Sequence, residues 1–237
     1  MTILGIETAT ERLGAALVTR DGRLFERHTD SRSSHCELLP GFITELSAES
    51  GVPLDRIEGI AVSAGPGSFT GLRIGIATAM GLACGLGIPA CGVNTLAALA
   101  WNAAGGGALV CPLIDARRAE AYTAVYRIGM GEPETVVEPA AVPIARIAVI
   151  LAGLGEPVTL TGPAAGTFRP IIEAAGELPL EFLSAESAKP SAVAIARLGR
   201  IIFASGGGGS PASLSPVYLR RSDAELVKPK RSPFAVS

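Results

Sequence analysis

The chain has few of the side chains that build common metal and catalytic sites. Its 237 residues include two histidines, His28 and His35, and four cysteines with no Cys-x-x-Cys pair. A structural or catalytic metal needs three or four such ligands, so the sequence predicts no metal site. The isolated cysteines, with no signal-like segment before the first apolar run, predict a reduced, cytoplasmic protein.

The chain also lacks an excess of charge of either sign. Its formal net charge is −2 and its pI is about 5.8. Proteins that bind nucleic acid as their main task usually have a basic face and a high pI, so this composition argues against such a role. A minor contact through Lys228, Lys230 and Arg231 stays open.

Three further signatures are missing. The turn after Gly65 has no Gly-Lys-Ser/Thr ending, which excludes a P-loop, and no Gly-x-Ser-x-Gly surrounds Ser63 or Ser68. No charged residue lies between Arg73 and Asp115, a length sufficient for a membrane span. Because residues 74–92 are mostly small and are interrupted by Pro89, we interpret them as a buried helix and a core strand.

Apolar spacing predicts an α/β chain. Strands are expected over residues 3–8, 13–19, 24–29, 57–64, 108–115, 121–127 and 158–161. Helices are expected over residues 34–50, 69–86, 96–103, 165–175 and 191–204. The stretch between residues 128 and 157 reads as irregular, and the tail after Pro211 as extended or mobile.

Local signals refine these boundaries. Asp21-Gly22 predicts a hairpin turn, and Ser34 with Glu37 has the spacing of a capping box. Ser68 is the expected N-cap of the second helix. Gly105-Gly106-Gly107 marks the expected domain boundary, with domains at 1–104 and 108–237.

The second helix is apolar almost all round and has small residues every four positions. They are Gly71, Gly75, Ala79, Ala83 and Gly87. Such a ridge lets another helix approach closely. The sequence leaves two interpretations open, because a partner subunit and the same domain would bury the ridge equally well.

Several segments together carry a family resemblance. They are Ile3-Leu4-Gly5-Ile6-Glu7-Thr8-Ala9-Thr10, the Ser34-to-Pro40 segment, Gly65-Pro66-Gly67-Ser68-Phe69-Thr70-Gly71-Leu72-Arg73, Asp115-to-Tyr122 and Ser215-to-Arg220. Strand, Gly-Pro-Gly turn and helix resemble the first domain of the ASKHA superfamily, the fold of actin, Hsp70 and sugar kinases. Within it, the chain resembles the group that makes threonylcarbamoyladenosine in tRNA.

Departures from the catalytic branch of that group, TsaD, identify the chain as similar to the TsaB (YeaZ) branch. After Val93-Asn94, where TsaD has two metal-binding histidines, this chain has Thr95 and Leu99. Threonine is a poor ligand for a transition metal and leucine offers no donor atom. Asp115 lies where TsaD has a glycine-rich phosphate loop, and the late Gly-Gly-Val-Ala-Ala-Asn nucleotide motif has no counterpart.

The resemblance implies an ASKHA fold of two ribonuclease-H-like subdomains, the second reduced, with the last helix packed back on the first. It also implies a non-catalytic scaffold that binds a TsaD-like subunit, helps recruit a TsaE-like ATPase, and forms a homodimer when alone. Any tRNA contact would be indirect or minor, with no membrane partner. The expected interface on the first two helices consists of Leu38, Leu39, Phe42, Leu46, Arg73, Gly75, Ile76, Ala79, Met80 and Ala83.

A second hypothesis is a free-standing ASKHA phosphotransferase or ATPase. Glu7 lies where ASKHA enzymes place an acid near nucleotide-bound metal, so Glu7, Thr8, Thr10 and Asp115 are the candidate residues of a residual nucleotide cleft. The favoured hypothesis, the scaffold, assigns no catalytic residue, no metal and no cofactor of the chain's own. It leaves open weak ATP or ADP binding at a subunit interface. The missing histidines and altered phosphate loop favour the scaffold.

Overall fold

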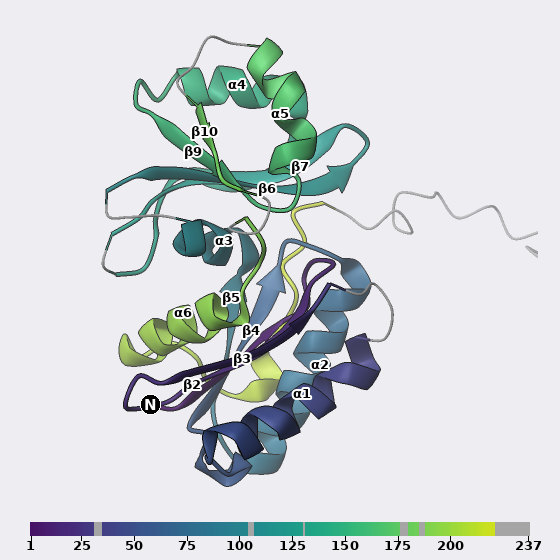
Figure 1. Ribbon diagram of the computed structural model, residues 1–237, viewed down its shortest axis with the longest axis vertical. Coiled ribbons are helices and arrows are strands. Elements are labelled where there is room, and N and C mark those ends of the chain that lie inside the picture. The colour runs from purple at the N-terminus through teal and green to yellow at the C-terminus, as the bar shows by residue number, and fades with distance from the viewer. Residues whose placement is uncertain (31–34, 104–106, 130, 176–179, 185–187, 221–237) are drawn as a thin grey trace, which may run out of the picture.

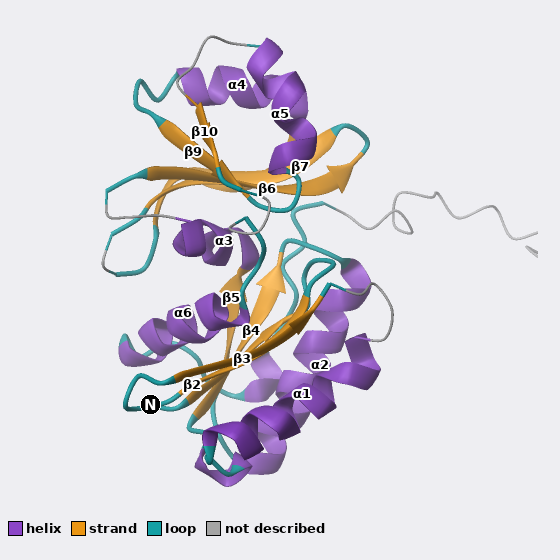
Figure 2. Ribbon diagram, viewed as in Figure 1, coloured by secondary structure: helices purple, strands orange, loops and turns teal. Residues whose placement is uncertain are grey.

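The computed structural model places two mixed sheets one above the other, with a short helix between them (Figure 1). It describes residues 1–30, 35–103, 107–129, 131–175, 180–184 and 188–220. Helices and strands alternate along most of the chain, so the predicted α/β class is confirmed (Figure 2).

The first sheet has five strands in the order β3-β2-β1-β4-β5. The strands are β1 (Ile3–Glu7), β2 (Leu13–Val18), β3 (Leu24–Thr29), β4 (Gly59–Gly65) and β5 (Ala90–Asn94). The first three form an antiparallel meander, whose turn at Gly22 has a φ of 88°. β4 and β5 run parallel to β1, so these three strands end at one edge, which faces the second sheet (Figure 1).

Helices cover both faces of this sheet. On one face, α1 (His35–Ser50) and α2 (Phe69–Leu86) lie side by side (Figure 1) and share a core with Leu4, Ile6 and Val62. On the other face, α6 (Ala192–Ala204) packs on Ile3 and Ala61. Successive apolar residues of β1 and β4 point to opposite faces of the sheet, so these strands contribute to two separate cores.

Two glycines let α6 lie close to the strands. A Cβ on Gly5 of β1 would lie 2.3 Å from the carbonyl oxygen of Ala192, and one on Gly199 would lie 2.3 Å from the Cβ of Ala61. Neither position has room for a side chain, so the contact needs glycine on the strand at one point and on the helix at the other. The last long helix thus belongs physically to the first sheet.

The ends of α2 follow its sequence signals. The Ser68 hydroxyl accepts a hydrogen bond from the amide of Gly71, which confirms the predicted N-cap, and Gly87 ends the helix with a φ of 67°. Within the described residues, α2 is the only helix long and apolar enough to cross a bilayer by length and composition. Here it packs against the sheet instead.

The second sheet has the strand order β10-β9-β6-β7-β8. Its strands are β6 (Leu109–Arg117), β7 (Glu120–Arg127), β8 (Glu134–Pro143), β9 (Val158–Thr161) and β10 (Leu180–Phe182). One face packs on α4 (Ile144–Ala152) and α5 (Ala165–Ala174), and the other on α3 (Thr95–Ala103), which lies between the sheets (Figure 1). Two 3₁₀ turns, Leu54–Arg56 and Pro211–Ser213, complete the described elements.

The interpretation of residues 128–157 as irregular is wrong. This stretch forms the edge strand β8 and the helix α4, and β10 was not expected either. β8 is largely exposed or half-buried and includes two prolines, two glutamates and no regular alternation, so its sequence has little strand signal. Ser34 of the expected capping box lies outside the described residues.

Candidate functional site

Glu7 is a buried carboxyl group at the end of β1. Its side chain is 1% exposed, and its Oε1 accepts a hydrogen bond from the Ala9 amide at 2.6 Å. No described residue gives a hydrogen bond to its Oε2. Burial raises the pKa of Glu7 to about 7, although hydrogen bonds from Ala9, Ser63 and Thr10 act in the opposite direction.

The Gly65-Pro66-Gly67 turn holds the backbone that follows Glu7. A Cβ on Gly67 would lie 2.2 Å from the carbonyl oxygen of Ala9, and that oxygen accepts a hydrogen bond from the Ser68 amide at 2.7 Å. Gly65 has a φ of 118°, which favours glycine. The turn therefore closes over the end of β1 rather than standing open to a ligand.

Thr8 and Thr10, the neighbours of Glu7 in the predicted cleft, have different surroundings. Thr8 is fully buried, its amide donates to Ser63 Oγ at 3.1 Å, and its own hydroxyl has no described partner. Thr10 is half-buried and its hydroxyl accepts from the Arg12 amide at 3.3 Å. Thr8 thus helps to pack the end of β1 against Ser63 of β4. Thr10 stabilises the loop that follows β1.

Asp115, the fourth residue of the predicted cleft, belongs to the second sheet. It lies on β6, where its Oδ1 accepts from the Arg117 amide at 2.7 Å and its Oδ2 lies 3.3 Å from Arg117 Nη1. Within the described residues, no hydrogen bond or ion pair links it to Glu7, Thr8 or Thr10. The direct partner of Asp115 is therefore Arg117, at the end of the same strand.

These residues do not fit a magnesium-bound nucleotide. A hard cation needs ionised oxygen ligands that solvent or phosphate can reach. Glu7 is enclosed and its pKa is raised, and Asp115 is engaged with Arg117. Among the described residues, no three His, Cys, Asp or Glu side chains are grouped as a metal would require.

The C-terminal strap, residues 215–220, connects the two sheets. The Val217 amide donates to the Ala64 carbonyl at 2.7 Å, directly beside the Gly65 turn. Tyr218 stacks on Phe69 of α2 with ring centroids 5.4 Å apart. Arg220 Nη1 donates to the Ala116 carbonyl at 3.1 Å and lies 3.5 Å from Glu120 Oε2.

The strap corrects the expectation of a mobile tail up to Arg220. Its course from β4 and α2 to β6 and β7 places chain across the junction of the sheets, next to the turn that would face a nucleotide (Figure 1). Residues 221–237, and with them Lys228, Lys230 and Arg231, lie outside the described residues.

The junction of β5 and α3 contains the two residues that replace the histidines. Asn94 Oδ1 accepts from the amides of Leu96 and Ala97, at 2.8 and 3.1 Å, and so caps α3. Thr95 is 1% exposed, and Leu99 is 2% exposed in the core between α3 and the second sheet. Both side chains are parts of the interior, not of an open metal site.

Six of the ten expected interface residues face the interior. They are Leu39, Leu46, Gly75, Ile76, Ala79 and Ala83. A Cβ on Gly75 would lie 2.2 Å from Thr8 Oγ1, so the small-residue ridge of α2 rests on β1. For these six, the interpretation that the same domain buries them is correct. Of the other four, Leu38 and Arg73 are exposed and Phe42 and Met80 are half-buried.

The outward face of α2 has a second row of small residues, which the sequence reasoning missed. Ala77, Gly81 and Gly85 follow Arg73 at four-residue intervals, and all four residues are exposed. A Cβ on Gly81 or Gly85 would meet no atom within 4 Å. Leu38 of α1, 37% exposed, adds an apolar side chain to the same helix pair.

Comparison with known proteins places this geometry in a family. Residues 29–170 match the family model described as "TsaD: tRNA N6-adenosine threonylcarbamoyltransferase". Curated "tRNA threonylcarbamoyladenosine biosynthesis protein TsaB" sequences from Bacillus subtilis and Escherichia coli are 36% and 40% identical over 61% and 54% of this chain. These matches span 63% and 55% of the two relatives, less than two thirds of their length.

The structural comparison covers nearly the whole chain. The solved structure described as YeaZ from Pseudomonas aeruginosa is 31% identical, covers 92% of this chain and 99% of its own, and superimposes with a TM-score of 0.81. Together with the TsaD-like match, this similarity confirms the ASKHA-like fold. The chain therefore belongs to the TsaB/YeaZ family.

Proposed function

We propose that this protein takes part in tRNA threonylcarbamoyladenosine biosynthesis as a non-catalytic partner of a TsaD-like threonylcarbamoyltransferase. The names of its relatives in Bacillus subtilis and Escherichia coli support the pathway. The observation that carries the non-catalytic role is the burial of Thr95 and Leu99 at the start of α3. Neither side chain offers a ligand to a metal at that point.

The outer face of α1 and α2 is the proposed contact with the TsaD-like subunit. Ala77, Gly81 and Gly85 give α2 a flat face with no bulky side chain between it and a facing helix. Leu38 and the half-buried Met80 supply apolar area beside it. In the absence of that subunit, the same face would pair two copies of this chain.

Further partners follow from the same role. A TsaE-like ATPase would join the complex, and this chain would help to recruit it. We expect tRNA contact to be indirect or minor, because the net charge of the chain is −2. Any ATP or ADP would be bound weakly at a junction between subunits, since Glu7 is enclosed within this one. All of these steps belong in the cytoplasm.

The alternative, a free-standing phosphotransferase or ATPase, has weaker support. It requires Glu7 and Asp115 to act on one magnesium nucleotide. Glu7 is 1% exposed with its pKa raised to about 7, and Asp115 is held by Arg117. The strap also occupies the junction beside the Gly65 turn.

Complex formation tests the proposed role directly. The chain is mixed with a cognate TsaD-like subunit, and the molar mass is measured by size-exclusion chromatography with light scattering. We expect the mixture to form a stable complex of both chains. This chain measured without the TsaD-like subunit should have the molar mass of a homodimer. A chain that stays separate from that subunit at micromolar concentration would contradict the proposal.

A further inference from the structure

The C-terminal strap is anchored in two different cores. Leu214, directly before the strap, packs on the core of the first sheet, and Leu219 packs on the core that α3 forms with the second sheet. A step of five residues spans at most about 18 Å, so the strap limits how far the two anchors can separate. Pro216 stiffens the chain between them, because its ring fixes its own φ and restricts Ser215 to extended conformations.

Polar contacts also fasten the strap to both sheets. On the first sheet, the Val217 amide donates to the Ala64 carbonyl of β4 at 2.7 Å. On the second sheet, Arg220 Nη1 donates to the Ala116 carbonyl of β6 at 3.1 Å and lies 3.5 Å from Glu120 Oε2 of β7. These contacts are close together along the strap, so a large change in the angle between the sheets would strain or break one of them.

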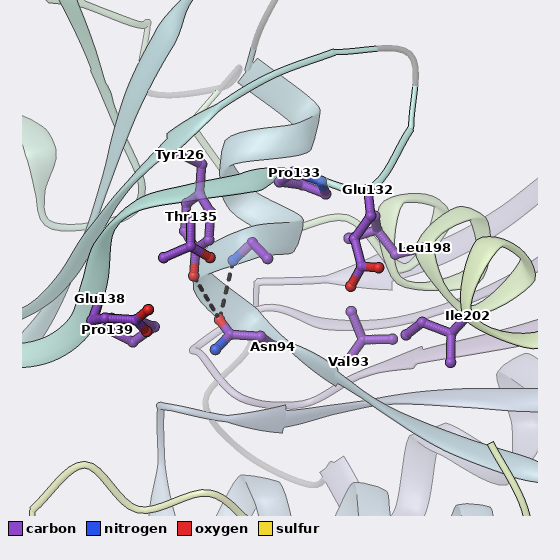
Figure 3. Close-up of a pocket in the computed structure, with 11 residues that line it drawn as sticks. Val93, Asn94, Tyr126, Glu132, Pro133, Thr135, Glu138, Pro139, Leu198 and Ile202 are labelled. Carbon is purple, nitrogen blue, oxygen red and sulfur yellow. Dashed lines mark hydrogen bonds between the residues drawn. The ribbon is translucent and has the colours of Figure 1, made fainter. Parts of the chain in front are cut away.

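The two sheets have room to move at the other end of β7. There, a pocket of about 240 Å³ lies between them (Figure 3). Its walls come from both sheets, with Val93 and Asn94 on β5 and Tyr126 on β7. The Tyr126 hydroxyl donates to Asn94 Oδ1 at 3.5 Å, the limit for a hydrogen bond (Figure 3). This end of β7 is therefore held less firmly than the end beside the strap.

The contacts that α3 makes between the sheets are mostly apolar. Leu96 and Leu99 pack with Val110 of β6 and Ala124 of β7. Apolar contacts have no preferred direction, so they hold the sheets together without fixing the angle between them. Directional contacts, such as those of the strap, are needed to fix that angle.

The strap is also held by the outer face of α2. Tyr218 stacks on Phe69, and Arg73 Nε donates to the Tyr218 hydroxyl at 3.2 Å. Tyr218 and Phe69 are 41% and 42% exposed, so water competes for these contacts in the free chain. Arg73 lies at the start of the exposed row of small residues on α2. A protein that covers this row as far as Arg73 would exclude water from these contacts and strengthen them.

We propose that the strap is a brace that sets the angle between the two sheets, and that a protein bound to the outer face of α2 tightens it. With the strap fastened, the second sheet keeps one position. With Tyr218 away from Phe69, the second sheet rocks on α3 and changes the width of the pocket at the far end of β7. The brace is a property of this chain alone, and only its tightening by a TsaD-like subunit rests on the proposed function.

The distance between the two sheets tests the brace. Spin labels are attached at Ala204→Cys, at the end of α6, and at Gly166→Cys, on α5, which are both exposed positions. The two exposed cysteines are replaced by Cys36→Ser and Cys84→Ser, and the other two are buried. Double electron–electron resonance then measures the distribution of distances between the labels. We expect one narrow distribution for this labelled parent.

Variants separate the brace from a general loss of stability. We expect Tyr218→Ala and Leu219→Ala to broaden the distribution, since each frees the strap from one sheet. Ile43→Val is the control, because it removes a buried methylene group from the first core and leaves the strap intact. Its distribution should match that of the parent. Unchanged widths for the two strap variants, or equal broadening by Ile43→Val, would overturn the proposal.

Tyr218→Phe tests the tightening. This variant keeps the stacking on Phe69 but loses the hydrogen bond from Arg73, so the free chain should have a distribution of intermediate width. We expect a bound TsaD-like subunit to restore the parent distribution in Tyr218→Phe and not in Tyr218→Ala. Equal effects on the two variants, in a complex that does form, would overturn the tightening. A parent chain that forms no complex would contradict the proposed function and with it the tightening, whereas the free chains alone decide the brace.

Discussion

Nε of Arg73 on α2 donates a hydrogen bond to the hydroxyl of Tyr218 at 3.2 Å, and its guanidinium lies 3.7 Å from the ring centroid of Phe69. Tyr218 also stacks on Phe69, so three side chains fasten the C-terminal strap to the first turns of α2. Since these residues are partly exposed, their hydrogen bond and cation–π contact contribute modestly, and the stacking of the rings is the larger effect.

Tyr218→Ala should lower the free energy of unfolding by about 1 kcal/mol, because the aromatic stacking is lost. Tyr218→Phe keeps the stacking and should cost about half as much. Urea unfolding followed by circular dichroism measures both. Val136→Ala, a change of an exposed residue on β8, is the control. A Tyr218→Ala chain as stable as that control would show that the strap is not held by this contact.

The two rows of small residues on α2 give opposite expectations. Gly75→Val should destabilise the fold by about 1–3 kcal/mol, because its Cβ would lie 2.2 Å from Thr8 Oγ1. Gly81→Glu should leave the fold intact and weaken binding of a TsaD-like subunit at least about tenfold, since it buries a charge in the contact. Thermal unfolding and calorimetric titration distinguish the two effects.

Gly166→Glu provides the matched control for Gly81→Glu. Gly166 is an exposed glycine in α5 with no atom within 4 Å of an added Cβ, and it lies on the second sheet's helix layer. We expect this variant to bind the TsaD-like subunit like the parent. If both variants bind as tightly as the parent, the outer face of α2 is not the contact.

The raised pKa of Glu7 makes stability depend on pH in a defined direction. The folded chain keeps this proton up to a pKa of about 7, whereas the unfolded chain releases it near 4.5. Between those values the folded state binds more protons, so stability falls as pH rises, by on the order of 3 kcal/mol in all from this group.

Glu7→Gln should remove this slope. Its amide stays neutral, so the variant should become more stable relative to the parent as pH rises from 5 to 8. Urea unfolding at several pH values gives the comparison, with Glu134→Gln as a control for an exposed carboxylate. Parallel stability profiles for Glu7→Gln and the parent would contradict the raised pKa.

The first sheet was predictable because its local signals agree with one another. The strands β1 and β2 are buried along their whole length, Asp21-Gly22 fits the turn between β2 and β3, and Ser68 caps α2. β8 was not predictable, because Pro139 and the exposed glutamates of this strand are typical of a loop sequence. Its strand character comes from pairing with β7 rather than from its own residues.

The candidate site shows a different limit of sequence reasoning. α2 has small residues on two faces, Gly75 and Ala79 on one and Ala77 and Gly81 on the other, with the same four-residue spacing. The contact between Gly75 and Thr8, the residue directly after β1, decides which face is inside. Likewise, Glu7 can be placed at a strand end from sequence, but its enclosure depends on the Gly67 turn.

Reconstituted transfer of threonylcarbamoyl to tRNA tests the central claim most directly. The assay compares this chain alone, a cognate TsaD-like subunit with a TsaE-like ATPase and the adenylate-forming enzyme, and the complete set. The account predicts modification only with the complete set and no turnover by this chain alone. Modification that proceeds equally well without this chain, or ATP hydrolysis by this chain alone, would contradict it.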